Sequence, residues 1–210
     1  KENDLLGGID PYSSSKASAE LIIQTYIKSF FSKKKNLSLA VARAGNVIGG
    51  GDMSKDRLIP DTIKNLLKNK TVIIRNPKAN RPWQHVLEPL YGYLILAKNL
   101  YLNRKKYSEA FNFGPSTSSI LNLKEIVKNI IKIWGYGKVK IIKKNNYPKE
   151  QQLLQLNSEK TMSKMHWKPF FTTFETISET THWYKKVFKD NEKPLKITTE
   201  QIEKYQNNKY

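Results

Sequence analysis

Short apolar runs alternate with longer amphipathic stretches in this chain, and this alternation restricts its fold more than any other sequence feature. Four runs rich in apolar residues, at 37–42, 72–74, 110–113 and 139–142, are too short for helices. Segments with helical spacing of apolar residues lie among and after these runs: 11–32, 58–67, 88–100, 121–134, 158–165 and 174–187. Strands that alternate with helices predict an α/β fold, with a parallel sheet in at least the first part of the chain.

Two stretches show neither pattern. Residues 44–55 are rich in glycine and predict a long loop after the first strand. The stretch from Asp190 to the last residue is polar, and we expect it to be loosely attached.

Length and composition limit the class of protein. With 210 residues, of which 39% are hydrophobic, the chain can form one substantial core, or one core with a smaller lobe. It contains no run near the roughly 18 apolar residues of a membrane span, so we expect no membrane partner. Cysteine is absent, which excludes disulfides and thiolate sites and fits a cytoplasmic protein. Three histidines without a spaced set of carboxylates predict no metal site.

The net charge of +19 raises the question of nucleic-acid binding. Only five of the 37 basic residues are arginine, and the lysines are scattered through every segment. Specific phosphate recognition favours the bidentate fork of arginine over lysine. We therefore interpret most lysines as solvated surface and expect no nucleic-acid partner. Four of the arginines fall in one part of the chain, between positions 43 and 81.

Tyr12 and Lys16 open the first predicted helix in the sequence Tyr-Ser-Ser-Ser-Lys. Residues four apart share one face of a helix. An ammonium beside a phenol favours the phenolate, which lets a tyrosine act as a general acid or base near neutral pH. By itself the pair is weak evidence, because a surface Tyr and Lys with this spacing occur in many helices.

Three further motifs follow in a fixed order. Arg43-Ala-Gly-Asn-Val-Ile-Gly-Gly-Gly-Asp52 comes after the first strand, then Leu58-Ile-Pro60, then Arg81-Pro-Trp-Gln-His-Val86. Together with Tyr12 and Lys16, this order resembles the extended short-chain dehydrogenases, which are NAD-dependent sugar-nucleotide dehydratases and epimerases. The residues of the glycine-rich motif and of Arg81–Pro89 are similar to those of the family branch that acts on CDP-glucose. The resemblance covers about residues 2–188 and includes the closing Trp167-Lys168-Pro169.

The resemblance implies the catalytic and cofactor-binding residues. Tyr12 would remove the proton of a sugar hydroxyl as hydride leaves for NAD. Lys16 would hold the nicotinamide ribose and tune Tyr12. The loop from Ala44 to Val47 would flank the nicotinamide.

The resemblance also implies a substrate site for a nucleotide sugar. Asn46 would reach the sugar, and Leu58, the first residue of the Leu-Ile-Pro motif, would also bind the substrate. Arg57, Arg75 and Arg81 would bind the diphosphate and nucleoside, while Asn112 would contact the nucleotide. His85 is expected to pack or hydrogen-bond within its loop rather than perform chemistry. The activity implied is 4,6-dehydration of CDP-glucose, in a full-length enzyme that is a homo-oligomer.

Several family features do not occur in these residues. No Gly-x-x-Gly-x-x-Gly follows a strand, and the glycines at 45–51 open no helix of the required kind. Pro148-Lys149-Glu150-Gln151 stands where the family has a Pro-His-Glu-Ala type of segment. The chain opens at Lys1 without an initiator Met. We therefore expect the fingerprint, the active-site Thr and the acid/base pair of dehydration upstream of Lys1, and a fragment that alone is inactive and poorly soluble.

The predicted architecture is the C-terminal half of a Rossmann-type parallel sheet with a small α/β substrate-binding lobe. Residues 1–115 would form a partial NAD-binding domain with interleaved lobe segments, 116–190 mainly the lobe, and 191–210 a polar tail. Two alternatives remain: an epimerase or reductase on the same scaffold, and a non-enzymatic basic domain that binds nucleic acid. The latter needs a basic stripe with stacking aromatics, which the scattered lysines do not supply.

Overall fold

The computed structural model describes residues 1–34, 36–115, 121–142 and 155–208. The chain divides into two compact units, each built from separated stretches of sequence. The first unit comprises Lys1–Arg43, Tyr91–Phe113 and Asn157–Trp167. The second comprises Ala44–Leu90, Gly114–Leu156 and Lys168–Tyr210.

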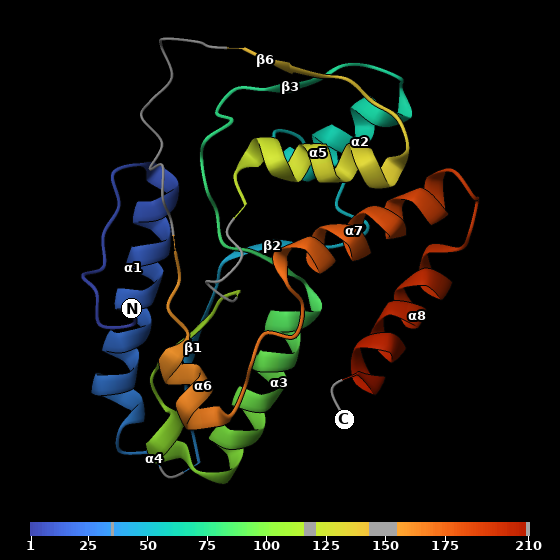
Figure 1. Ribbon diagram of the computed structural model, residues 1–210. Helices are drawn as coiled ribbons and strands as arrows, with labels where there is room; N and C mark the ends of the chain where they lie inside the picture. The colour runs from blue at the N-terminus through green and yellow to red at the C-terminus, as the bar shows by residue number, and fades with distance from the viewer. Residues whose placement is uncertain (35, 116–120, 143–154, 209–210) are drawn as a thin grey trace. The chain divides into compact units, whose positions relative to one another are not determined.

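The first unit surrounds a strand pair, β1 with β5 (Figure 1). Its aromatic core includes Phe111, Phe113 and Trp167, all fully buried. Gly92 is required here, because a Cβ at this position would lie 2.3 Å from the Phe113 ring. The elements are α1 (Pro11–Tyr26), the π-helix η1 (Ile27–Phe31), β1 (Val41–Ala44), most of α3 (Leu87–Leu102), α4 (Arg104–Tyr107), β5 (Ala110–Phe113) and α6 (Glu159–Met165).

The second unit has two parallel strand pairs, β2 with β4 and β3 with β6. Helices α2 and α5 lie next to the β3–β6 pair, and α7 packs on α5 and on the β2–β4 pair (Figure 1). The core centres on the apolar faces of α2, α5 and α7. The elements are β2 (Asn46–Ile48), α2 (Leu58–Leu67), β3 (Val72–Ile74), β4 (Trp83–His85), α5 (Leu123–Trp134), β6 (Val139–Ile141), α7 (Thr173–Phe188) and α8 (Pro194–Asn207).

The α/β prediction is confirmed, and most elements begin and end near the expected residues. Two differences concern strands. The first strand begins at Val41 instead of Leu37, and the glycine-rich stretch predicted as a loop contains β2. β2 and β4 have only three residues each and form because Asn46 pairs with Trp83 and Ile48 with His85. Pairing over such a sequence separation leaves no local signal in either strand.

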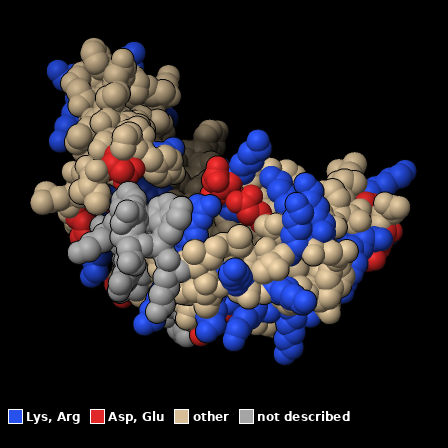
Figure 2. All heavy atoms as spheres, turned by 90° about the horizontal axis from the view of Figure 1, so that it is seen from above, with Lys and Arg blue, Asp and Glu red and all other residues tan. Residues whose placement is uncertain are grey.

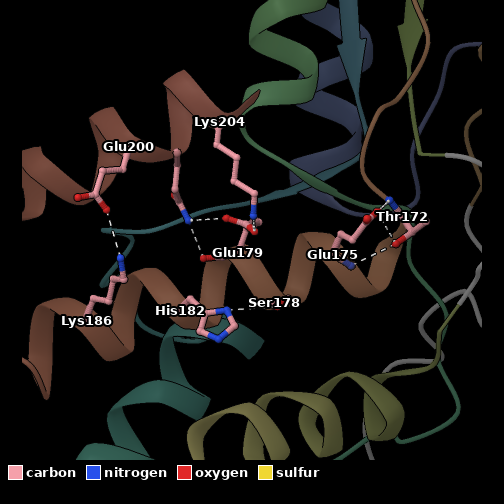
Figure 3. A network of polar contacts seen from close by, with 9 residues as sticks. Thr172, Glu175, Ser178, Glu179, His182, Lys186, Glu200 and Lys204 are labelled. Carbon is pink, nitrogen blue, oxygen red and sulfur yellow. Dashed lines mark hydrogen bonds and ion pairs between the residues drawn. The ribbon is translucent and has the colours of Figure 1, made fainter. Parts of the chain in front are cut away.

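The prediction of a loosely attached tail is wrong. Residues 194–207 form α8, which packs against α7 and buries Ile197 and Tyr205 to 2% and 4% exposure. Figure 3 shows the polar contacts between these helices: Lys204 with Glu179, and Lys186 with Glu200 at 3.2 Å. The polar residues that suggested a free tail form the outer face of a docked helix.

No helix among the described residues is long and apolar enough to cross a membrane. Lys and Arg side chains are scattered over the described part of the face in Figure 2, with uncharged residues between them. Their distribution agrees with our interpretation of most lysines as solvated surface.

Candidate active site

Asp10 fixes the start of α1 and thereby the position of Tyr12. Its carboxylate accepts hydrogen bonds from the backbone N–H groups of Tyr12 and Ser13 at 2.9 and 3.0 Å, and from the Ser13 hydroxyl at 2.6 Å. These bonds, that of the Ser13 hydroxyl first, lower the pKa of Asp10. Pro11 occupies the first turn, where its missing N–H costs nothing. Tyr12 therefore stands in the rigid first turn of the helix.

Tyr12 and Lys16 lie on the same side of α1. The Lys16 ammonium is 5.5 Å from the centroid of the Tyr12 ring, within the range of a cation–π contact. The Tyr12 side chain is 72% exposed, so its hydroxyl is accessible within the described part of the chain. The catalytic role of this pair remains a prediction, which the Tyr12 substitution discussed below would test.

An ion pair connects α1 to β1 in the first unit. Arg43 donates two hydrogen bonds to the Glu20 carboxylate, one of them from Nε at 2.8 Å, and a third to the Glu2 carbonyl at 3.3 Å. Glu20 is buried on α1. A bidentate guanidinium–carboxylate pair has a defined geometry. Arg43 therefore holds the helix of the Tyr–Lys pair against the strand that leads into the glycine-rich segment.

The predicted nicotinamide-flanking segment runs from the end of β1 into β2. The Asn46 N–H donates to the Pro82 carbonyl at 2.9 Å, which places Gly45 and Asn46 beside the Pro82–Trp83 peptide. A Cβ on Gly45 would lie 2.6 Å from that carbonyl oxygen, so only glycine allows this approach. Ala44 is half-buried and Val47 is 41% exposed. The backbone thus brings Asn46, on β2, next to the start of β4, two residues after the sequence-predicted site residue Arg81.

Asp52, at the end of the glycine-rich segment, organises the approach to α2. Its carboxylate accepts from the Ser54 N–H at 2.9 Å and from Arg57 at 3.0 Å. The Ser54 N–H, with Arg57 contributing, holds the pKa of Asp52 below its usual value. The buried Tyr184 hydroxyl donates to the Asp52 carbonyl at 2.6 Å, and burial raises the pKa of Tyr184 to about 12.

Asp52 was not among the predicted site residues, although it lies only five positions before Arg57. This ion pair fixes the Arg57 side chain. Arg57 directly precedes Leu58, the first residue of α2. Most of the Arg57 side chain is exposed, so the guanidinium can still bind an anionic ligand.

Arg75 and Arg81 flank a loop that is anchored on the N-terminus of α5. The carbonyls of Pro77 and Ala79 accept from the N–H groups of Lys124 and Leu123, at 3.3 and 3.1 Å. These bonds satisfy amide groups that the first turn of a helix leaves without partners. The Arg81 guanidinium donates to the Asn80 carbonyl at 2.8 Å. A fixed loop therefore holds both arginines in the second unit.

Asn112 lies within β5, in the first unit, and is almost fully buried. Its side-chain N–H donates to the Asn157 carbonyl at 3.1 Å, while its amide oxygen has no hydrogen-bond partner among the described residues. The Asn112 carbonyl accepts from the Thr161 hydroxyl at 2.6 Å. This amide already has a structural role, and a nucleotide contact would have to use its oxygen.

His85 is buried in β4 and packs edge-to-face on Phe171, with ring centroids 5.4 Å apart. Its Nδ1 accepts from the Leu87 N–H at 3.4 Å, as expected for a residue that packs and bonds within its own loop. Burial lowers the pKa of His85 to about 4. The ring is therefore neutral near neutral pH.

The buried His85 ring predicts a loss of stability in acid. Its folded pKa of about 4 lies below the ordinary 6.5, so protons bind preferentially to the unfolded chain between these values. The contribution of His85 to the free energy of unfolding is largest above pH 6.5 and decreases as the pH falls toward 4. We expect about 2 kcal/mol to be lost between about pH 7.5 and about pH 5, measured by urea unfolding. His85→Gln should remove this component and the exposed control His182→Gln should keep it; equal pH dependence in both variants would contradict the assignment.

The site residues divide between the two units. Tyr12, Lys16 and Asn112 lie in the first, whereas Ala44, Asn46, Val47, Arg57, Leu58, Arg75 and Arg81 lie in the second. No group of three or more possible metal-ligating side chains occurs among the described residues. A common pocket for the three arginines with Asn46 and Asn112 stays a prediction.

Comparison with known proteins identifies the class to which this fold and these motifs belong. Residues 2–114 match the NAD dependent epimerase/dehydratase family. The match covers more than half of the 210 residues, and the chain belongs to this family.

Among individual relatives, the chain is 42% identical over 189 residues to the CDP-glucose 4,6-dehydratase of Salmonella typhimurium, covering 88% of this chain and 53% of that protein. It is 26% identical to the dTDP-D-glucose 4,6-dehydratase of Mus musculus, covering 89% and 51%. The chain thus spans about half the length of the curated relatives it matches.

Solved structures show the same fold. The dTDP-glucose 4,6-dehydratase of Bacillus anthracis, in complex with NAD, matches with a TM-score of 0.72 at 26% identity, over 89% of this chain and 55% of that one. The UDP-glucuronic acid 4-epimerase of Bacillus cereus matches with a TM-score of 0.73 at 19% identity, over 89% and 56%. The second likeness concerns the fold alone.

Proposed function

We propose that this chain provides the Tyr–Lys pair and the nucleotide-sugar site of an NAD-dependent CDP-glucose 4,6-dehydratase. The observation that carries the substrate is the 42% identity to the Salmonella enzyme over 88% of the chain. The reaction would convert CDP-glucose to CDP-4-keto-6-deoxyglucose. The 4-ketone acidifies the C5 proton, and water is lost across C5–C6.

The residues present fit the nicotinamide end of the cofactor. The Lys16 ammonium is close to Tyr12 and makes no ion pair among the described residues, and Val47 in the segment after β1 is 41% exposed. Lys16 and the Ala44–Val47 segment would hold NAD. The chemistry that NAD would supply there is hydride transfer, away from C4 of the sugar and later back to C6. Tyr12, as a phenolate stabilised by the Lys16 ammonium, would accept the C4 hydroxyl proton and become the neutral phenol.

The nucleotide diphosphate would bind to the arginines of the second unit. A diphosphate accepts paired hydrogen bonds from guanidinium groups, which Arg57, Arg75 and Arg81 can donate. The Asp52–Arg57 ion pair and the loop anchored on α5, which holds Arg81, support this proposal. Asn46, on the strand next to Arg81, would contact the sugar.

Arg81→Ala should weaken CDP-glucose binding by about 1.5–3 kcal/mol, because one charged hydrogen-bond donor to the diphosphate is lost. Isothermal titration of the full-length protein would measure it. The control is Lys132→Ala, an exposed cation on α5, for which we expect a change below about 0.5 kcal/mol. Equal weakening by both substitutions would remove Arg81 from the nucleotide site.

The proposed activity is tested with the full-length protein, NAD and CDP-glucose, by mass and NMR analysis of the product. We expect a product lighter by one water that carries a ketone at C4. A C4 epimer of unchanged mass would instead identify an epimerase of the same family. The 210 residues contain no glycine-rich turn that opens a helix, so by themselves they should neither bind NAD tightly nor turn over substrate.

A further inference from the structure

The first unit contains a cavity of about 560 Å³ that none of the proposed catalytic or substrate residues lines. Its walls come from η1, the segment that leads to β1, the turn between α3 and α4, and the start of α4. The Val41 N–H donates to the Glu109 carbonyl at 3.1 Å, so these walls lie where β1 and β5 begin. The volume is within the range of pockets that bind small molecules.

The cavity is separate from the Tyr12–Lys16 pair. Tyr12 lies in the first turn of α1, whereas the cavity begins at Ile27, after α1 has ended. Fifteen residues of helix at 1.5 Å each place them about 22 Å apart along the helix axis. A ligand in the cavity would therefore not touch the proposed catalytic pair.

Four basic residues line the cavity. Lys33 and Lys34 follow η1, and Arg104 and Lys105 begin α4. Among the described residues that line the cavity none is acidic, and no ion pair within the described ranges involves these four cations. Four cations that line one cavity repel one another, and an anion between them would relieve the repulsion.

The inner wall is mainly apolar. Phe31, Ile27 and Leu39 are partly buried there, and Leu37 and Leu102 complete the apolar lining. Three hydroxyl side chains, those of Ser32, Ser38 and Ser108, also line it. An inorganic ion would leave the apolar wall without a partner, whereas an aromatic or aliphatic group would cover it.

The backbone of this wall is unusual. Ile27 and Phe31 are the first and last residues of the π-helix, whose wider turn is closed by the Ser32 N–H donating to the Ile27 carbonyl at 2.8 Å. Rings of Tyr26 and Phe31 lie 5.9 Å apart and support this turn. Single π-turns inside helices are rare and frequent at functional sites.

We infer that this cavity binds a small organic anion, with its phosphate or carboxylate among Lys33, Lys34, Arg104 and Lys105 and its apolar body on Phe31 and Leu39. The cavity lies far from the Tyr12–Lys16 pair, so this inference does not depend on the proposed function. The ligand class combines one acidic group with a ring or short alkyl body. Inorganic phosphate and an uncharged aromatic alcohol each supply only half of this chemistry.

Three probes separate the contributions: 1-naphthyl phosphate, 1-naphthol and inorganic phosphate, each titrated into the full-length protein by calorimetry. We expect 1-naphthyl phosphate to bind at least about tenfold more tightly than either of the others, since charge and apolar contact act together. Equal affinity of naphthyl phosphate and inorganic phosphate would reduce the site to an unspecific cationic patch and overturn the inference.

Variants locate the binding. Lys34→Gln combined with Lys105→Gln should weaken the binding of 1-naphthyl phosphate at least about tenfold. The matched control, Lys124→Gln with Lys128→Gln on the exposed face of α5, should change it less than about twofold. Leu37→Ser should weaken the binding of 1-naphthyl phosphate but not that of inorganic phosphate. Arg81→Ala should leave naphthyl phosphate binding intact; weakening by Arg81→Ala or by the control pair would place the probe elsewhere and refute the assignment.

Discussion

Replacing Tyr12 by Phe is expected to lower kcat of the full-length enzyme by about a thousandfold, the scale of a lost general acid/base. Phe retains the ring and its contact with Lys16 but cannot accept the C4 hydroxyl proton. The affinity for CDP-glucose should change little, because the arginines that would bind the diphosphate are untouched. Single-turnover measurement of reduced cofactor would show that the loss falls on the hydride step.

The matched control for this substitution lies on the same helix. Tyr26→Phe removes the same hydroxyl from the opposite end of α1, where Tyr26 packs on Phe30 at 5.4 Å between ring centroids. Turnover should stay within about a factor of two of the unmodified enzyme. Near-normal turnover by Tyr12→Phe would exclude Tyr12 from the mechanism, and equal loss in both variants would indicate damage to α1 instead.

The elements that local signals specify could be predicted closely. Helix α2 and strands β3 and β5 occupy the predicted residues, and α5 ends at Gly135, which adopts a φ of 103° that favours glycine. The Tyr12–Lys16 spacing likewise depends only on helical geometry. In each of these cases the determining residues are within a few positions of one another.

What escaped prediction depends on contacts between distant segments. Strand β2 forms against β4, more than thirty residues away, and α8 is stabilised by α7 instead of by an apolar run of its own. Two buried residues eight positions apart, Ile197 and Tyr205, were too few to indicate a docked helix. The ion pair between Arg57 and Asp52 was likewise not predicted, since no sequence pattern marks the two residues as partners.

Glu88 is a further residue whose burial and hydrogen-bond partners could not be predicted from the sequence. Its carboxylate is 1% exposed, in the first turn of α3, just after the Arg81–Val86 motif. It accepts from the backbone N–H groups of Phe170 and Phe171 at 2.8 and 2.6 Å, and from the Tyr205 hydroxyl at 2.8 Å. One side chain thus connects the start of α3, the segment before α7, and α8.

Glu88→Ala is expected to lower the free energy of unfolding by about 4 kcal/mol, because it leaves three donors, two of them buried, without their charged acceptor. Urea unfolding would measure the loss, and hydrogen exchange should show faster exchange in α8, which Tyr205 no longer anchors. Glu88→Gln should lose less, since its amide oxygen can still accept from both backbone N–H groups. The control Glu200→Ala removes an exposed partner of Lys186 and should cost less than about 1 kcal/mol. If Glu88→Ala were no worse than this control, the three hydrogen bonds would not hold α8 in place, and Ile197 and the apolar face of α7 would have to account for its docking.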